Sequence, residues 1–175
     1  MEKIPQRRLT IADALILVAA AGVGFAFARD WLGRYRQLNG NSFTGYEVFI
    51  YTTCWAALAI SIALIPLRLR RPRPRWRSLR WQPGLVACLA VLVSLVCSTF
   101  TYLPTIIKTP AGVTLWLQMV VWPTHIGPVI VAMWSLLAIG NRWRSEASWI
   151  DRAGRTLGFF WIASYALLTL ALALV

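Results

Sequence analysis

The chain has 175 residues, of which 58% are hydrophobic and only 14% are charged, and its net charge is +12. Soluble domains average about 45–50% apolar and about 25% charged residues. Because the excess apolar residues fall in separate blocks of near-span length, a single soluble core is excluded and several membrane crossings are predicted.

The first apolar block, residues 11–28, is predicted to be the first membrane-spanning helix. Thr10 and Asp13 have capping-box spacing at its start, with Asp replacing the usual Glu, so Asp13 is interpreted as a first-turn cap. Small residues recur every fourth position at Ala20, Gly24 and Ala28, a ridge that permits close packing against another helix.

A cleavable signal peptide is the alternative interpretation of this segment. A basic N-terminus precedes the apolar run, and residues 26–28 read Ala-Phe-Ala, which resembles a cleavage site. Asp13 interrupts the run, and three arginines follow it closely at Arg29, Arg34 and Arg36, which favours a retained helix. The remaining topology is the same under both interpretations.

A loop over residues 29–46, with a turn signal at residues 39–41, is expected to lead into a second span at 48–67 that ends at Pro66. Next comes an arginine-rich loop, residues 68–81, which we interpret as a cytoplasmic anchor that contacts anionic lipid headgroups. Its proposed headgroup contacts are Arg70, Arg71, Arg73, Arg75 and Arg77. Nucleic-acid binding, with Trp76 and Trp81 as stacking platforms, is disfavoured because the loop is too short to fold into a module.

The third span is predicted at residues 85–103, closing with Pro104, and Ser94, Ser98 and Thr101 line one of its faces. The fourth block, residues 112–139, is long and carries two prolines, so it is predicted to be kinked or broken at Pro123 or Pro128. A polar loop, residues 140–156, leads to a fifth span at 157–175.

The distribution of cationic residues predicts the orientation, because cationic residues in short loops remain in the cytoplasm. With the N-terminus inside, 14 of the 18 cationic residues are cytoplasmic. The sequence therefore predicts an all-α integral membrane protein: one domain over residues 1–175, a compact bundle of about five helices in the cell membrane, with the C-terminus outside.

Only one histidine occurs in the chain, His125, and it lies between the two prolines of the fourth block. If that block is one helix, Thr114, Gln118 and His125 fall near one face and form a candidate polar site within the membrane. If the helix instead begins near Pro123, which suits a first turn, His125 is an interface residue. Cys54 and Cys97 could share a depth with His125 as metal ligands, although three residues on separate helices are weak grounds for a metal site.

Groups typical of known catalytic centres are missing from the sequence. All six acidic residues lie in tails, loops or block ends, which disfavours an acid-based proton relay. No phosphate-binding glycine loop, H-E-x-x-H or G-x-S-x-G motif occurs. We therefore expect no enzymatic activity, no catalytic residues, no cofactor and no metal.

Residues 8–15, Arg-Leu-Thr-Ile-Ala-Asp-Ala-Leu, followed by Leu-Val-Ala-Ala at 17–20, resemble the opening of small multi-pass bacterial membrane proteins of unknown function. The resemblance covers about 20 residues and implies no activity and no site residues. Two functions remain open. One is a non-enzymatic membrane component that binds lipids, partner proteins or copies of itself through its helix faces. The other is a small oligomeric transporter or channel subunit whose fourth helix lines the pathway.

Overall fold

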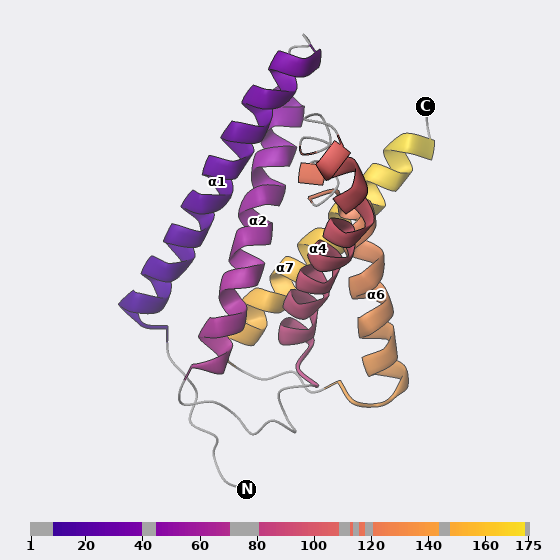
Figure 1. Ribbon diagram of the computed structural model, residues 1–175. Helices are drawn as coiled ribbons and strands as arrows, with labels where there is room; N and C mark the ends of the chain where they lie inside the picture. The colour runs from indigo at the N-terminus through magenta and orange to yellow at the C-terminus, as the bar shows by residue number, and fades with distance from the viewer. Residues whose placement is uncertain are drawn as a thin grey trace, which may run out of the picture.

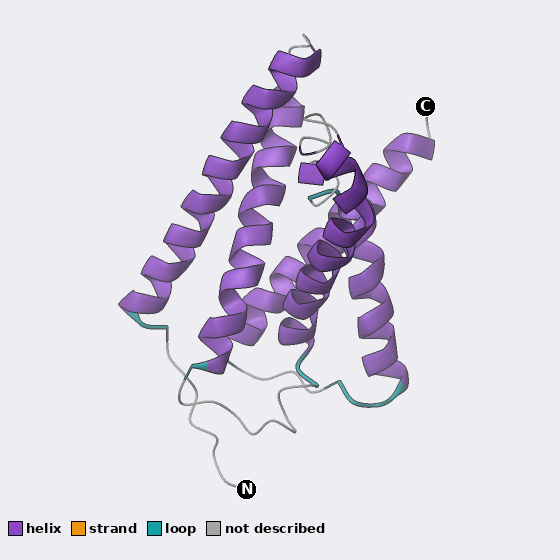
Figure 2. Ribbon diagram, in the orientation of Figure 1, coloured by secondary structure: helices purple, strands orange, loops and turns teal. Residues whose placement is uncertain are grey.

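Each helix of the fold contains an apolar run bounded by polar segments. In the computed structural model, the described residues form five helices and no strands (Figures 1 and 2). The structure describes residues 9–39, 45–70, 81–108, 113, 116–117, 121–143 and 148–173. The helices are α1 (Ile11–Asn39), α2 (Gly45–Leu69), α4 (Pro83–Lys108), α6 (Pro123–Ile139) and α7 (Trp149–Ala173). The all-helical prediction is thus confirmed for this part of the chain.

Successive helices alternate in direction along the bundle (Figure 1). One end, which we call the Arg68 end, contains the start of α1, the end of α2, the start of α4, the end of α6 and the start of α7. The opposite end, which we call the Asn39 end, contains the other termini of the same helices. Three helices, α1, α2 and α4, are long and apolar enough to cross a membrane, and α6 is a shorter apolar helix.

The helices α1, α2, α4 and α7 extend beyond the apolar blocks that predicted them, whereas α6 begins inside its block, so several expected boundaries are wrong. Residues 29–39, expected as loop, continue α1, where an exposed Asp30–Arg34 ion pair of 2.9 Å supports the extra turns. Hydropathy indicates only the part of a helix that suits a lipid environment. The backbone hydrogen bonds of the helix can continue into the polar residues that follow. The turn signal at residues 39–41 does coincide with the end of α1, and residues 40–44 lie outside the described part.

Neither Pro66 nor Pro104 ends its helix, contrary to the sequence prediction. Pro66 lies inside α2, and its carbonyl accepts a hydrogen bond of 3.1 Å from the N–H of Arg70. Pro104 lies inside α4, which runs on to Lys108. A proline removes one donor and crowds the preceding turn, and near a helix end the cost is small enough for the last turn to form.

The fourth block is not one continuous helix across the described residues. The backbone of Trp122 is extended, with φ −74° and ψ 121°, and Pro123 occupies the first turn of α6. Pro128 lies within α6, so the helical break falls at Pro123. The kink at a proline remains a prediction.

The α7 helix begins at Trp149, earlier than the predicted residue 157, so the expected loop over residues 140–156 is partly helical. A local cap explains the earlier start: the N–H of Asp151 donates to Ser148 Oγ at 3.4 Å. The same Ser/Thr-x-x-Asp spacing occurs at Thr10 and Asp13, where both reciprocal bonds of 3.2 Å form, which confirms the predicted cap.

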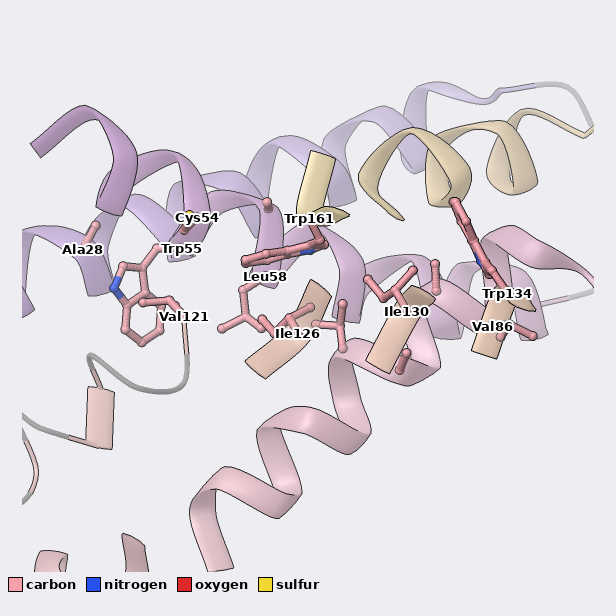
Figure 3. Packing of buried hydrophobic residues seen from close by; sticks show 14 of the residues in the cluster. Ala28, Cys54, Trp55, Leu58, Val86, Val121, Ile126, Ile130, Trp134 and Trp161 are labelled. Carbon is pink, nitrogen blue, oxygen red and sulfur yellow. The ribbon is translucent and has the colours of Figure 1, made fainter. Parts of the chain in front are cut away.

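Aromatic and branched aliphatic side chains fill the centre of the bundle (Figure 3). Trp31 of α1 and Trp161 of α7 are both fully buried, and Ile126 and Ile130 of α6 pack in the same cluster. The apolar helices differ in how many of their residues are buried. In the most apolar segment of α1, 17% of the residues are buried, compared with 50% in that of α4. The α1 helix packs mainly on α2, whereas α4 and α7 each pack against α2, against α6 and against one another.

Candidate functional site

Buried polar side chains gather at the Arg68 end, where α2, α4 and α7 meet. Arg68, Gln82 and Asp151 are each less than 5% exposed. We call this group the Asp151 cluster, and its described members are Arg68, Gln82, Gly84, Ser148, Asp151 and Arg155. Buried polar groups are costly unless they are hydrogen-bonded, so the bonds within the cluster decide whether it stabilises the fold.

Two helix starts meet at the Asp151 carboxylate. Its Oδ1 accepts a hydrogen bond of 3.0 Å from the backbone N–H of Gly84, in the first turn of α4. The first N–H groups of a helix have no partner within the helix and carry a partial positive charge. The side chain of Asp151 therefore caps the start of α4. The side chain of Ser148 caps the start of α7 by accepting a hydrogen bond from the Asp151 N–H.

Arginines surround the same carboxylate. Arg155 Nε lies 3.3 Å from Asp151 Oδ2, within ion-pair distance but without the geometry of a hydrogen bond. Arg68 Nε donates to Gln82 Oε1 at 2.9 Å. Burial raises the pKa of Asp151 above its usual range, and the Gly84 N–H, Arg155 and Arg68 each act in the opposite direction. Desolvation thus outweighs the favourable charges around this acid.

A close backbone crossing of α4 and α7 holds the cluster together. A Cβ placed on Gly84 would meet the backbone carbonyl oxygen of Asp151, and one placed on Gly154 would lie 2.5 Å from the carbonyl oxygen of Gly84. One turn along α7, a Cβ on Gly158 would lie 2.5 Å from the ring of Trp134. Trp134 in turn donates its indole N–H to the Pro83 carbonyl at 3.0 Å.

This crossing was missed in the sequence, although a signal for it was present. Gly154 and Gly158 form a G-x-x-x-G pattern at the start of α7, and such pairs let helix backbones approach closely. The adjoining cavity is lined by residues such as Leu64 and Cys88 and has room for about one water molecule. The Asp151 cluster therefore serves to join helices, and its cavity is too small for a substrate.

A second polar region is an open groove between α4 and α6, lying toward the Asn39 end. The α4 wall carries Ser94, Cys97, Ser98 and Thr101, the polar face noted in the sequence, and the α6 wall carries His125. Val93, Tyr102 and Val129 complete the lining. We call this the α4–α6 groove.

Its polar groups differ in whether they have partners. The hydroxyl of Thr101 donates to the Cys97 carbonyl at 2.9 Å. Ser94 is 6% exposed, and its hydroxyl oxygen has no hydrogen-bond partner among the described residues. Ser61 of α2, also buried, instead donates to the Ala57 carbonyl at 2.7 Å. Ser94 therefore differs from Ser61 in that its buried hydroxyl is unsatisfied.

The structure places His125 in the first turn of α6, where it is exposed, so it is not at the centre of one long helix. This placement agrees with the interface interpretation. Gln118 and Thr114, the other two residues of the candidate polar site, lie outside the described residues.

The three potential metal ligands are not brought together. Cys97 and His125 line the α4–α6 groove, whereas Cys54 is buried in the hydrophobic core. No group of three or more His, Cys, Asp or Glu residues able to hold a metal occurs within the described ranges.

The arginine-rich loop is described only at its edges. Arg70 is exposed directly after α2, and Arg71, Arg73, Arg75 and Arg77 lie outside the described residues. At its other edge, the Arg142 guanidinium lies 4.4 Å from the centre of the Trp81 ring. This cation–π contact joins the end of the loop to the segment between α6 and α7.

The small-residue ridge of α1 faces α2. Gly24 and Ala28 are buried and Ala20 is half-buried. A Cβ on Gly24 would lie 2.6 Å from the Trp55 carbonyl oxygen and 2.7 Å from Ala56 Cα. The absence of a side chain at Gly24 therefore permits the close approach of α1 and α2.

The fold and these two polar regions define a helical protein with three candidate membrane-spanning helices. The chain matches no protein-family model, no curated protein and no solved structure. Its function is therefore inferred from its own residues.

Proposed function

We propose that the chain is a multi-pass protein of the cell membrane, with five spans, the N-terminus in the cytoplasm and the C-terminus outside. The alternating helix directions support this topology. They bring the end of α2, the start of α4, the end of α6 and the start of α7 to the same end of the bundle, and these termini adjoin the two arginine-containing loops (Figure 1). Cationic loops remain on the cytoplasmic side, so the Arg68 end is assigned to the cytoplasm.

Accessibility of single cysteines tests the topology. In a chain with its three native cysteines replaced by serine, a Cys at Ser78 should react with an impermeant maleimide only after the membrane is permeabilised. A Cys at the exposed Gln37, near the Asn39 end, should react in intact cells. Labelling of Ser78→Cys from outside would overturn the orientation.

Within the membrane we propose a non-enzymatic component that binds lipids or partner proteins through its helix faces. The observation that carries this proposal is the outer surface of α1, where Ile11, Leu15 and Val18 are 83%, 64% and 69% exposed. Large apolar surfaces on a folded chain are typical of membrane or protein contact. The exposed Arg70 at the end of α2 is positioned for anionic headgroups in this arrangement.

One observation favours a second candidate, a small transporter or channel subunit. The α4–α6 groove brings His125 and a row of hydroxyl groups to one side of α6, the described helix of the proposed pathway block. Purification in mild detergent and reconstitution into liposomes separate the two functions. A stably co-purifying protein or lipid supports the membrane component, and solute flux from the chain alone supports the transporter.

A further inference from the structure

We propose that the exposed face of α1 binds an anionic phospholipid of the outer leaflet, with the headgroup phosphate at Arg29 and an acyl chain along the apolar residues before it. The inference rests on the proposed membrane location and orientation, and it assigns one class of lipid to one helix face. Its starting point is a shallow hollow toward the Asn39 end of α1, which is lined by Ala26, Arg29, Asp30, Gly33, Arg34 and Gln37.

The charge of this part of α1 is unexpected for its side of the membrane, because cationic residues are normally kept on the cytoplasmic side. The proposed topology leaves four of the 18 cationic residues outside, and three of them are Arg29, Arg34 and Arg36 in the last turns of α1. Arg34 is paired with Asp30 at 2.9 Å. Arg29 and Arg36 are exposed and make no ion pair with any residue that the structure describes. Their charge is therefore available to an external anion.

A glycine leaves the backbone accessible within the hollow. A Cβ on Gly33 would meet nothing within 4 Å, whereas Gly24, which packs closely on α2, lies on the opposite side of α1. Arg29 precedes Gly33 by four residues, so the two are neighbours on one helix face. Arginine binds phosphate oxygens through parallel N–H groups. A phosphate beside Gly33 is thus within reach of the unpaired Arg29 guanidinium.

The same face of α1 is apolar on the membrane side of the hollow. Ile11, Leu15 and Val18 are exposed along it, and steps of three or four residues continue the face through positions 22 and 26 to Arg29. Arg29 follows Ile11 by 18 residues, which is about 27 Å of helix. A hydrocarbon core is about 30 Å thick, so Arg29 lies at the level of the outer headgroups. An apolar strip that ends in a cation at this depth matches a phospholipid better than it matches a soluble anion.

Photochemical cross-linking beside the hollow is the test. A local probe is needed because the arginine-rich loop at the Arg68 end is itself expected to bind anionic lipid. In the chain with its three native cysteines replaced by serine, Phe25→Cys carries a benzophenone maleimide. The protein is reconstituted into liposomes of equal phosphatidylglycerol and phosphatidylcholine with the same acyl chains, and mass spectrometry identifies the lipid attached on illumination. The anionic phosphatidylglycerol is expected to predominate.

The matched control places the same probe on α4, as Phe100→Cys. Phe25 and Phe100 are both exposed, and they lie 14 and 17 residues from helix starts that are both at the Arg68 end (Figure 1). The probe at Phe100 should attach the two lipids in the proportion of the liposome. Any enrichment at Phe25 is then a property of the α1 face and not of that depth in the bilayer.

Two variants separate the charge of the hollow from its shape. Arg29→Gln should lower the ratio of the two lipids at the Phe25 probe about fivefold, which corresponds to about 1 kcal/mol for one cationic residue near a membrane surface. Gly33→Leu keeps every charge but fills the hollow, and should lower the ratio as well. Gly22→Leu adds the same side chain where a Cβ also meets nothing within 4 Å, outside the hollow, and should leave the ratio unchanged.

Equal ratios at the two probes would overturn the inference, and so would an unchanged ratio in Arg29→Gln or in Gly33→Leu. Loss of the phosphatidylglycerol adduct in the presence of soluble glycerol phosphate would mean that the hollow holds a free anion, and the assignment to a lipid would be wrong. Both leaflets of the liposome have the same composition, so these results do not depend on the proposed orientation. Recovery of the chain in the soluble fraction of cells would instead overturn the membrane location itself.

Discussion

The Asp151 cluster and the α4–α6 groove are two polar regions of one apolar bundle, and they differ in how their polar groups are satisfied. In the cluster, the carboxylate of Asp151 has a backbone N–H at 3.0 Å and an arginine at 3.3 Å. In the groove, the buried hydroxyl of Ser94 has no partner within the described residues. A polar group whose hydrogen bonds are made inside the chain stabilises the fold, whereas a buried hydroxyl without a partner costs stability.

The largest effect is expected from Gly84→Ala, which adds a methyl group where α4 and α7 backbones touch. The methyl group would meet the backbone of Asp151, which cannot move without separating the two helices. We expect a loss of about 3 kcal/mol in unfolding free energy, the upper part of the range for overpacking. Thermal unfolding of the purified protein in detergent measures it.

Gly33→Ala is the matched control for that change. A Cβ on Gly33, in α1, would meet nothing within 4 Å. Alanine favours helix over glycine, so this variant should gain roughly 0.5–1 kcal/mol. Equal destabilisation by both substitutions would contradict the close crossing of α4 and α7.

The next effect is expected at Asp151 itself. Asp151→Ala removes the acceptor for Gly84 and the counter-charge of Arg155, and should cost about 2 kcal/mol, since breaking buried pairs is strongly destabilising and Arg155 is partly exposed. Asp151→Asn keeps an acceptor oxygen and should cost less than about 1 kcal/mol. If Asp151→Ala and Asp151→Asn have the same melting temperature, the hydrogen bond from the Gly84 N–H contributes nothing to the stability of the fold.

Acid should stabilise the cluster, because burial raises the pKa of Asp151 in the folded chain. The folded state binds this proton more tightly than the unfolded state, so its contribution to unfolding free energy rises as the pH falls through the raised pKa toward the usual value of about 3.9. Asp151→Asn lacks the titrating group. The melting-temperature difference, wild type minus Asp151→Asn, should therefore increase on acidification, and a decrease would contradict the direction of the shift.

The smallest effect is expected from His125→Ala, in the groove. His125 is exposed in the first turn of α6, and substitutions of exposed residues usually change stability by less than about 0.5 kcal/mol. Detergent melting curves of the two purified proteins should overlap. A large loss of stability would mean that His125 has a buried partner, and it would restore the polar site with Gln118 as the leading hypothesis.

Local signals in the sequence account for much of the fold. The caps at Thr10 and Asp13, and the proline that begins α6, act within one helical turn, so sequence spacing alone reveals them. The start of α7 had the same kind of signal in Ser148-x-x-Asp151. Hydropathy alone indicates only residues 157–175, because the first two turns of α7 are polar.

The candidate site could not be predicted in the same way. The sequence predicts Asp151 to be an ordinary loop acid, since nothing adjacent to it in sequence indicates burial. Its main partner, Gly84, is 67 residues away. The α4 side of the groove could be predicted, because Ser94, Ser98 and Thr101 fall on one face of a helix. The side supplied by His125 depends on how α6 packs against α4.

The sequence alone determined that the chain forms apolar helices, because runs of apolar residues near span length have few other stable conformations and each helix pairs its backbone groups internally. Only the tertiary structure decided which polar groups are buried and which of them have partners. Burial depends on contacts between helices distant in sequence. At the glycine crossing of α4 and α7, such contacts leave no room for even one methyl group.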